Sequence, residues 1–295
     1  MNKSHLANVA AAAAALCAGT SVVATRFAVV EIDPVSLAFY RYLIAAICLV
    51  PFLPFVWPKT RVPFADVVKI ALLGAVFFGF FPWAFSAALQ YTTAARGAIG
   101  VATIPIQTLI VAALFGREKM TGRKLLSVAL AFIGIAIVFG PAAYGGEESS
   151  YLVGDGLMLL GAFSAAIYSV FGRPLFGKHG PMFVMALAVV FGILALLMLA
   201  IASGALNGLP HFSAKGWLAV ILLGTVGAAI QFSLFTWALR WLPSSRVVIY
   251  LTLNPISAIL LASLLLGEAV TPLLIAGLVF VIAGIVVVNW QTAER

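Results

Sequence analysis

The sequence predicts an all-α integral membrane protein of ten transmembrane helices, arranged as two inverted five-helix repeats with the N- and C-termini in the cytoplasm. Of 295 residues, 64% are hydrophobic and 9% are charged, whereas an ordinary soluble domain carries about 25% charged residues. Lipid must therefore solvate most of the surface. The two other observations are an internal duplication and an uneven distribution of Lys and Arg between the apolar segments.

The duplication relates residues 88–138 to residues 238–288 by a shift of 150 positions without a gap, with 13 identities in 51 positions. The identities that are not aliphatic all fall in one register: Arg96 and Arg246, Pro105 and Pro255, Glu118 and Glu268, Thr121 and Thr271, Gly134 and Gly284. Nearer the start of each copy, a shift of 147 aligns Arg26 with Arg173 and Pro34 with Pro181. The sequence therefore contains an internal duplication.

Ten apolar segments have about the 20 residues that a spanning helix needs. They are 5–28, 34–57, 66–90, 93–115, 121–139, 154–176, 181–203, 213–240, 244–266 and 271–290. The first segment follows Lys3 and is rich in Ala, as in a signal peptide. We favour an uncleaved span, because the apolar run continues to about Ala28 and the repeat needs a helix there.

The predicted organisation is a first repeat over residues 1–140, an outer linker over 141–153 and a second repeat over 154–295. Each repeat holds five spans, and an odd number brings the second copy into the membrane from the opposite side. With the N-terminus inside, 13 of the 17 Lys and Arg face the cytoplasm, Arg26, Arg96 and Lys215 face outward, and Arg41 lies within a span. This bias is the positive-inside pattern.

The segments "GREKMT" and "LLLGEAVT", each after a span with a central proline and before a Gly-bearing helix, carry a family resemblance. The chain resembles the drug/metabolite transporter superfamily, more narrowly its EamA-type ten-helix exporters, and is most similar to the YddG-type aromatic amino acid exporters. The resemblance implies a multi-pass protein of the bacterial inner membrane. It also implies export from the cytoplasm by alternating access around a central cavity.

The spans lack an acidic residue near mid-depth, because all nine Asp and Glu map to loops or helix ends. Exporters that exchange organic cations for protons need such a buried carboxylate. We therefore expect a neutral or zwitterionic substrate, foremost an aromatic or hydrophobic amino acid, and as the alternative another neutral metabolite or a drug. A passive channel would need a continuous polar stripe, and an enzyme would need a nucleophile or metal cluster. We expect no cofactor, no metal and no nucleic acid partner, and a monomer or weak homodimer in the bilayer.

Two mid-span prolines predict the substrate site. Proline frees a backbone carbonyl one turn earlier, and a membrane tolerates a free carbonyl where it faces protein or a water-filled cavity. Thr103 and Gln107 flank Pro105, and Asn254 precedes Pro255. The alternative is a pair of packing kinks. We expect spans 1, 3, 4, 6, 8 and 9 to line the cavity between these breaks.

Further candidates for substrate binding are a mid-span amide and aromatic side chains, which suit an amino acid with an apolar side chain. They are Gln231, Phe235, Tyr168, Tyr250, and Phe81 and Phe85 on the face of span 3 that corresponds to Gln231. A helix–helix hydrogen bond is the alternative role for Gln231, and contact with lipid is the alternative for the phenylalanines.

Three charged residues are expected to be structural or to gate the pathway. Arg41 lies within span 2, where it could extend outward or pair with Asp33 or Glu31. We favour a structural or gating role over contact with the substrate. Glu118 and Glu268 each precede the start of a helix, where a carboxylate is favourable. Small residues at Ser127, Gly134, Gly277 and Gly284 predict close packing of spans 5 and 10, within one chain or between chains.

Overall fold

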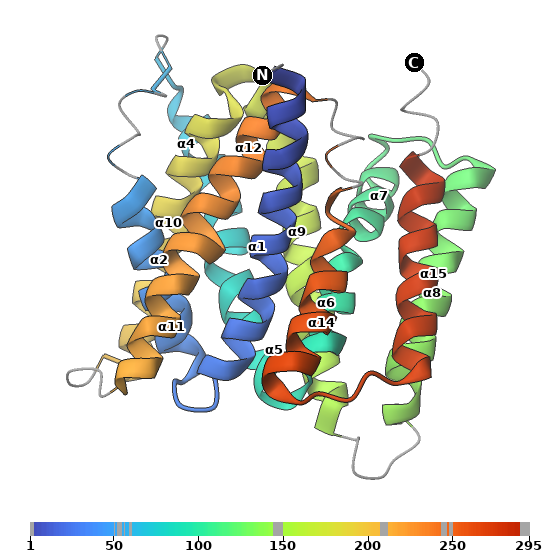
Figure 1. Ribbon diagram of the computed structural model, residues 1–295. Coiled ribbons are helices and arrows are strands. Elements are labelled where there is room, and N and C mark those ends of the chain that lie inside the picture. Colours follow the sequence, from blue (N-terminus) through green and yellow to red (C-terminus); the bar gives the residue numbers. More distant parts are fainter. Residues whose placement is uncertain are drawn as a thin grey trace.

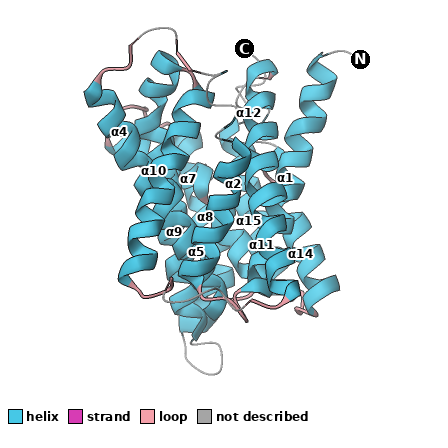
Figure 2. Ribbon diagram, turned by 90° about the vertical axis from the view of Figure 1, so that its left-hand side faces the viewer, coloured by secondary structure: helices cyan, strands magenta, loops and turns pink. Residues whose placement is uncertain are grey.

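The described part of the chain consists of helices and connecting loops, with no strand. The computed structural model describes residues 3–49, 51, 55, 57–58, 61–143, 150–206, 212–242, 247 and 250–289. Figure 2 shows only helices and connecting loops among them. Residues 144–149 of the predicted outer linker and Arg246 lie outside the described residues. α1 begins at the end of the bundle where α15 finishes (Figure 1).

Seven helical stretches are long and apolar enough to cross a membrane, and three shorter apolar helices accompany them among the described residues. In chain order the helices are α1 (Lys3–Ala28), α2 (Pro34–Leu49), α4 (Phe64–Gly74), η2 (Ala75–Phe80), α5 (Phe81–Tyr91), α6 (Ala94–Ala102), α7 (Ile104–Leu114), α8 (Gly122–Ala143), α9 (Tyr151–His179), α10 (Pro181–Ala202), α11 (Ala214–Gly224), η4 (Thr225–Ile230), α12 (Gln231–Trp241), α14 (Leu253–Leu266) and α15 (Pro272–Asn289).

Local sequence signals set many of the helix ends. The Thr93 side chain accepts the N–H of Arg96 at the start of α6, and the Ser213 side chain accepts the N–H of Gly216 at the start of α11. Such hydroxyls satisfy donors that have no partner within a helix. Gly180, with φ 86°, separates α9 from α10. That left-handed conformation favours glycine, so a sharp turn is possible between two long helices.

The predicted interruptions near the two prolines are confirmed. Helix α6 ends at Ala102, Thr103 forms a turn, and α7 begins directly before Pro105. In the second copy Leu251 and Thr252 form the turn, and α14 begins two residues before Pro255. Both breaks follow from the missing proline N–H.

Two π-helical segments occur at corresponding places in the two copies. η2 spans residues 75–80 and η4 spans residues 225–230, so the shift of 150 relates them residue for residue. They join α4 to α5 and α11 to α12 without a break in the helix. π-Helical turns are rare in proteins, and those that occur are often found at functional sites. The sequence analysis did not predict them.

Contacts between the two copies come in corresponding pairs. A Cβ added to Gly74 would lie 2.4 Å from the carbonyl oxygen of Ala188, and one added to Gly224 would lie 2.7 Å from the carbonyl oxygen of Arg41. The shifts of 150 and 147 convert the first pair into the second. At both places a glycine lets two helix backbones touch.

The predicted close packing of the two repeat-terminal helices is confirmed, and it occurs within one chain. α8 and α15 lie side by side (Figure 1). Ser127 Oγ donates to the carbonyl oxygen of Gly284 at 2.8 Å. A Cβ at Gly134 would lie 2.7 Å from the carbonyl oxygen of Gly277, and one at Gly277 would lie 2.8 Å from that of Gly134. The small residues therefore serve this intramolecular interface.

A buried ion pair fixes the start of α6 against α9. The guanidinium of Arg96 contacts Asp155, with Nε 3.3 Å from Oδ1, and the hydroxyl of Thr92 donates to the same carboxylate at 2.9 Å. The rings of Phe139 and Tyr151 lie 5.2 and 5.1 Å from the Arg96 guanidinium carbon. Beside this pair Gly154 lies against the backbone of α5, where an added Cβ would be 2.7 Å from the carbonyl oxygen of Ala88.

Candidate functional site

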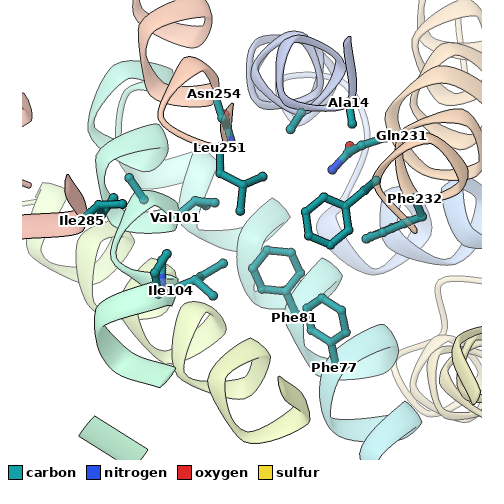
Figure 3. Close-up of a pocket in the computed structure, with 14 residues that line it drawn as sticks. Ala14, Phe77, Phe81, Val101, Ile104, Gln231, Phe232, Leu251, Asn254 and Ile285 are labelled. Atoms are coloured by element: carbon teal, nitrogen blue, oxygen red, sulfur yellow. The ribbon is translucent and has the colours of Figure 1, made fainter. Parts of the chain in front are cut away.

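A cavity of about 180 Å³ lies between the two copies at the level of the helix breaks (Figure 3). Residues from α1, η2, α5, α6, α7, α12, α15 and the start of α14 line it. They are Ala14, Ala18, Phe77, Phe81, Val101, Ala102, Ile104, Pro105, Gln231, Phe232, Phe235, Leu251, Asn254 and Ile285. The cavity is therefore mostly apolar with a few polar groups, which is the usual composition of a small-molecule site.

A smaller cavity of about 60 Å³ adjoins the first and shares six wall residues with it. The shared residues are Ala18, Phe81, Val101, Gln231, Phe232 and Asn254. The smaller cavity adds Ser21, Val22, Arg41, Tyr42, Pro82 and Phe85. The pair forms one hollow with an apolar main part and an extension that contains a charged side chain.

The broken helices contribute corresponding residues to the main cavity. Pro105 cannot donate to the carbonyl of Val101, and Pro255 cannot donate to that of Leu251. Val101 and Leu251 both line the cavity, and the shift of 150 relates them. The helix breaks therefore lie against the cavity.

Two amide side chains supply polarity in the shared wall. Gln231 is the first residue of α12, directly after η4, and its side chain points into the cavity from the side opposite Val101 (Figure 3). Asn254 is 8% exposed, and its Oδ1 has no hydrogen-bond partner among the described residues. A buried acceptor without a partner costs free energy, so Asn254 is suited to a ligand that brings a donor.

Aromatic rings form one side of the main cavity. The ring centroids of Phe77 and Phe81 are 5.4 Å apart, and Phe77 stacks on Tyr168 at 4.8 Å. These rings cover α9, since Gly161 of α9 lies against Phe81. No described residue of α9 lines either cavity. The expectation that span 6 lines the cavity is therefore wrong, because aromatic side chains of span 3 fill the space in front of it.

Six of the eleven residues predicted to bind substrate line the two cavities. They are Phe81, Phe85, Pro105, Gln231, Phe235 and Asn254. Their role in binding stays a prediction. The sequence analysis did not single out Phe77, Phe232 or the alanines of α1. Phe77 and Phe232 each lie within four residues of a predicted wall residue, which is the only signal that the sequence holds for them.

The other five predicted residues lie outside both cavity walls. Gln107 Nε2 donates to Thr103 Oγ1 at 3.0 Å and to the carbonyl oxygen of Leu159 at 3.3 Å, so it joins α7 to α9. Pro255 is buried in α14. Tyr168 lies behind Phe77, and Tyr250 packs on the cluster of Ala7 and Ala238.

Glu268 caps a helix of the other copy, although we expected it to act on the helix that follows it. Its two carboxylate oxygens accept the N–H groups of Ala94 and Ala95, at 2.8 and 3.1 Å, and Arg26 Nε lies 4.0 Å away. Glu118 instead meets Lys124 Nζ at 2.7 Å on the surface. The positive end of α6 favours the Glu268 carboxylate.

We expect Glu268→Ala to lower the free energy of unfolding by about 1 kcal/mol, since α6 loses its capping carboxylate. Glu118→Ala is the matched control at the corresponding position. It removes only a surface ion pair, which contributes roughly 0–1 kcal/mol. Thermal unfolding of both variants in one detergent tests this expectation. Equal losses of stability would contradict it.

The described residues contain no group of three or more His, Cys, Asp or Glu placed to hold a metal ion. Cys17 and Cys48 are free thiols. A ligand in the two cavities would contact two amide side chains, an aromatic wall and Arg41.

Comparisons with known proteins agree with this architecture. A model of the EamA-like transporter family matches the chain twice, over residues 5–140 and 152–290. A solved crystal structure of 18% sequence identity superposes with a TM-score of 0.65 over 98% of each chain, and it shows the fold alone.

Three similar proteins illustrate the range of relatives. An uncharacterized transporter of Archaeoglobus fulgidus is 25% identical over 92% of this chain and 94% of its own length. The uncharacterized inner membrane transporter YedA of Escherichia coli is 28% identical over 86% and 80%. A protein of Streptantibioticus cattleyicolor described as a "probable terminal-alkyne amino-acid exporter" is 26% identical over 81% and 77%. Because the family model covers nearly the whole chain in two copies, the protein belongs to the EamA-like transporter family.

Proposed function

We propose that this transporter exports amino acids, foremost aromatic and hydrophobic ones, from the bacterial cytoplasm by alternating access. The observation that carries the proposal is the cavity between the two copies, where Gln231 and Asn254 face an aromatic wall that includes Phe77 and Phe81. An amide can donate to a carboxylate and accept from an ammonium group. Aromatic walls stabilise apolar side chains.

We further propose ten spanning helices in two inverted halves, over residues 1–140 and 154–295, joined by an outer linker. Support comes from the seven long apolar helices with three shorter ones, and from the corresponding contacts of Gly74 and Gly224 across the halves. The bias of Lys and Arg supports a cytoplasmic location of both termini. The name of the relative YedA supports an inner-membrane location. Both cavities lie within one chain, which supports a monomer, or a weak homodimer whose chains each transport by themselves.

Two features favour amino acids over other cargo. The described spans hold no carboxylate in either cavity wall, which disfavours exchange of organic cations for protons. A relative that matches over 81% of the chain is named as an amino-acid exporter. Transport then follows the rocking of the two halves around the cavity, which opens it to each side in turn.

Counterflow in liposomes tests the proposal. Vesicles with purified protein are preloaded with unlabelled Phe, Trp, Thr or a lipophilic cation, and the uptake of the labelled compound is followed. We expect saturable counterflow of Phe and Trp above the level in protein-free vesicles. Flux of the cation alone would favour a drug exporter, and unsaturable flux at channel rates would overturn both readings.

Variants of the two amides give the corresponding residue test. Gln231→Ala and Asn254→Ala each remove a hydrogen bond to a charged substrate group, worth about 1.5–3 kcal/mol. We expect the apparent affinity for Phe to fall by roughly 10- to 100-fold. Thr225→Ala in η4 is the control, because among the described residues Thr225 donates to the carbonyl of Ile221 and lines neither cavity. Wild-type affinity in both amide variants would exclude them from the site.

A further inference from the structure

Arg41 is a charged side chain buried in the wall of the smaller cavity. It is 7% exposed and lies in the middle of α2. Its Nη2 donates to Ser21 Oγ at 2.8 Å and to the carbonyl oxygen of Gly227 at 3.0 Å, and Nη1 lies 3.4 Å from Thr25 Oγ1. Its Nε is buried and has no hydrogen-bond partner among the described residues. Neutral oxygens therefore hold the guanidinium in place and leave a donor unused.

No described carboxylate neutralises Arg41. The predicted pairing with Glu31 or Asp33 does not form, because Glu31 binds the hydroxyl of Ser213 at 2.7 Å and Asp33 caps the start of α2. The bonds from Ser213 also lower the pKa of Glu31, so this carboxylate stays ionised where it is. The other described carboxylates, Asp66, Glu118, Asp155 and Glu268, each bind groups elsewhere.

A buried charge without a counter-ion is costly, and proteins normally pair it or use it. Within a membrane such a residue marks a functional site by default. Arg41 lines the smaller cavity together with Ser21, whose hydroxyl accepts a hydrogen bond from the guanidinium. The charged group therefore lies beside the cavity.

The two copies differ at the positions that create this polar extension. The shifts of 147 and 150 place Tyr168 at the position of Ser21, Ala188 at that of Arg41, and Phe77 at that of Gly227. At one of the two corresponding contacts between the copies, the rings of Phe77 and Tyr168 stack with their centroids 4.8 Å apart and fill the space. At the other contact a Cβ on Gly227 would lie 2.9 Å from Ser21 Oγ, so small residues leave room for the guanidinium. The hollow therefore carries a guanidinium at one end and none at the other.

We propose that Arg41 is the binding site for the carboxylate of the transported molecule. The inference rests on the proposed function and narrows its substrate class to molecules with a free carboxylate. Asn254 lies in the wall that both cavities share, and its Oδ1 has no partner among the described residues. This oxygen accepts a hydrogen bond from the ammonium group of the same molecule. The apolar side chain then faces Phe77 and Phe81. An aromatic amino acid satisfies all three regions at once.

Binding of acids and of their amides by the purified protein tests this assignment. Phenylalanine is compared with phenylalaninamide, and 3-phenylpropionate with 3-phenylpropionamide, by ligand-dependent shifts of thermal unfolding in detergent. We expect each acid to bind at least tenfold more tightly than its amide. Arg41→Gln should remove that preference, and Arg41→Lys should retain part of it. Arg26→Gln is the control, since Arg26 donates to the carbonyl of Leu89 and lines neither cavity.

Phenylalanine has an ammonium group and 3-phenylpropionate has none, so comparing them tests the carboxylate site and the amino-acid function separately. If the amides bind as tightly as the acids while Phe counterflow persists, the assignment of Arg41 is wrong and the amino-acid function stands. If 3-phenylpropionate binds through Arg41 but no amino acid is exchanged, the carboxylate site stands and the amino-acid function is wrong. Wild-type protein is enough for the comparison of acids with amides, so failure of an Arg41 variant to fold does not block the test.

Discussion

Asp155→Asn should lower the free energy of unfolding by about 3–5 kcal/mol, the usual cost of removing one partner from a buried ion pair. Arg96 and Asp155 are 8% and 3% exposed. Without the carboxylate charge, the guanidinium stays buried between α6 and α9, flanked by the rings of Phe139 and Tyr151. The loss is measured by thermal unfolding in detergent, with the yield of monodisperse protein as a second readout.

Two further variants distinguish loss of the pair from loss of a hydrogen bond. Asp155→Asn with Arg96→Met removes both charges, and we expect it to be more stable than Asp155→Asn alone, because no buried charge remains unpaired. Glu118→Gln breaks the surface pair with Lys124 and should cost less than about 1 kcal/mol. A double variant less stable than Asp155→Asn would show that the charge is not the cause.

Gly154→Ala and Gly156→Ala should change stability in opposite directions, although they lie two residues apart on α9. A Cβ at Gly154 would lie 2.7 Å from the carbonyl oxygen of Ala88 and 2.9 Å from the backbone nitrogen of Thr92. These backbone atoms cannot move aside as a side chain can, so α9 and α5 must separate. Overpacking of this kind costs about 1–3 kcal/mol.

At Gly156 an added Cβ would meet no atom within 4 Å. Alanine restricts the unfolded chain more than glycine does, so Gly156→Ala should stabilise the helix by about 0.5–1 kcal/mol. Thermal unfolding of the two variants under the same conditions makes the comparison. Loss of stability of equal size in both would mean that the contact with Ala88 is not what requires glycine at position 154.

Much of the fold could be predicted because lipid imposes simple rules on a sequence. Long apolar runs must form helices to satisfy their backbone groups, and proline must interrupt them. The breaks beside Pro105 and Pro255 and the contact of Gly134 with Gly277 follow from residue types whose backbone chemistry is particular. Because the two copies align, a feature predicted in one copy was also expected at the corresponding position of the other.

The cavity walls were harder to predict, since helical periodicity alone does not say which face of an apolar helix meets lipid. Gln107 and Gln231 are both mid-span amides, yet one joins α7 to α9 and the other lines the cavity. Only the positions of neighbouring helices decide between them. The π-helical segments η2 and η4 add to the difficulty, because an i→i+5 turn rotates every later side chain relative to a regular α-helix. Phe81 and Gln231 follow directly after these segments.

Because Arg41 lies at only one end of the hollow formed by the two cavities, the hollow can orient a bound molecule. A duplicated protein with identical copies offers a molecule two equivalent poses, head toward one half or head toward the other. Here Ser21 and Gly227 occur where the other copy has Tyr168 and Phe77, so the two poses differ in free energy. With its carboxylate bound at Arg41 as we propose, a transported molecule occupies only one of these two poses.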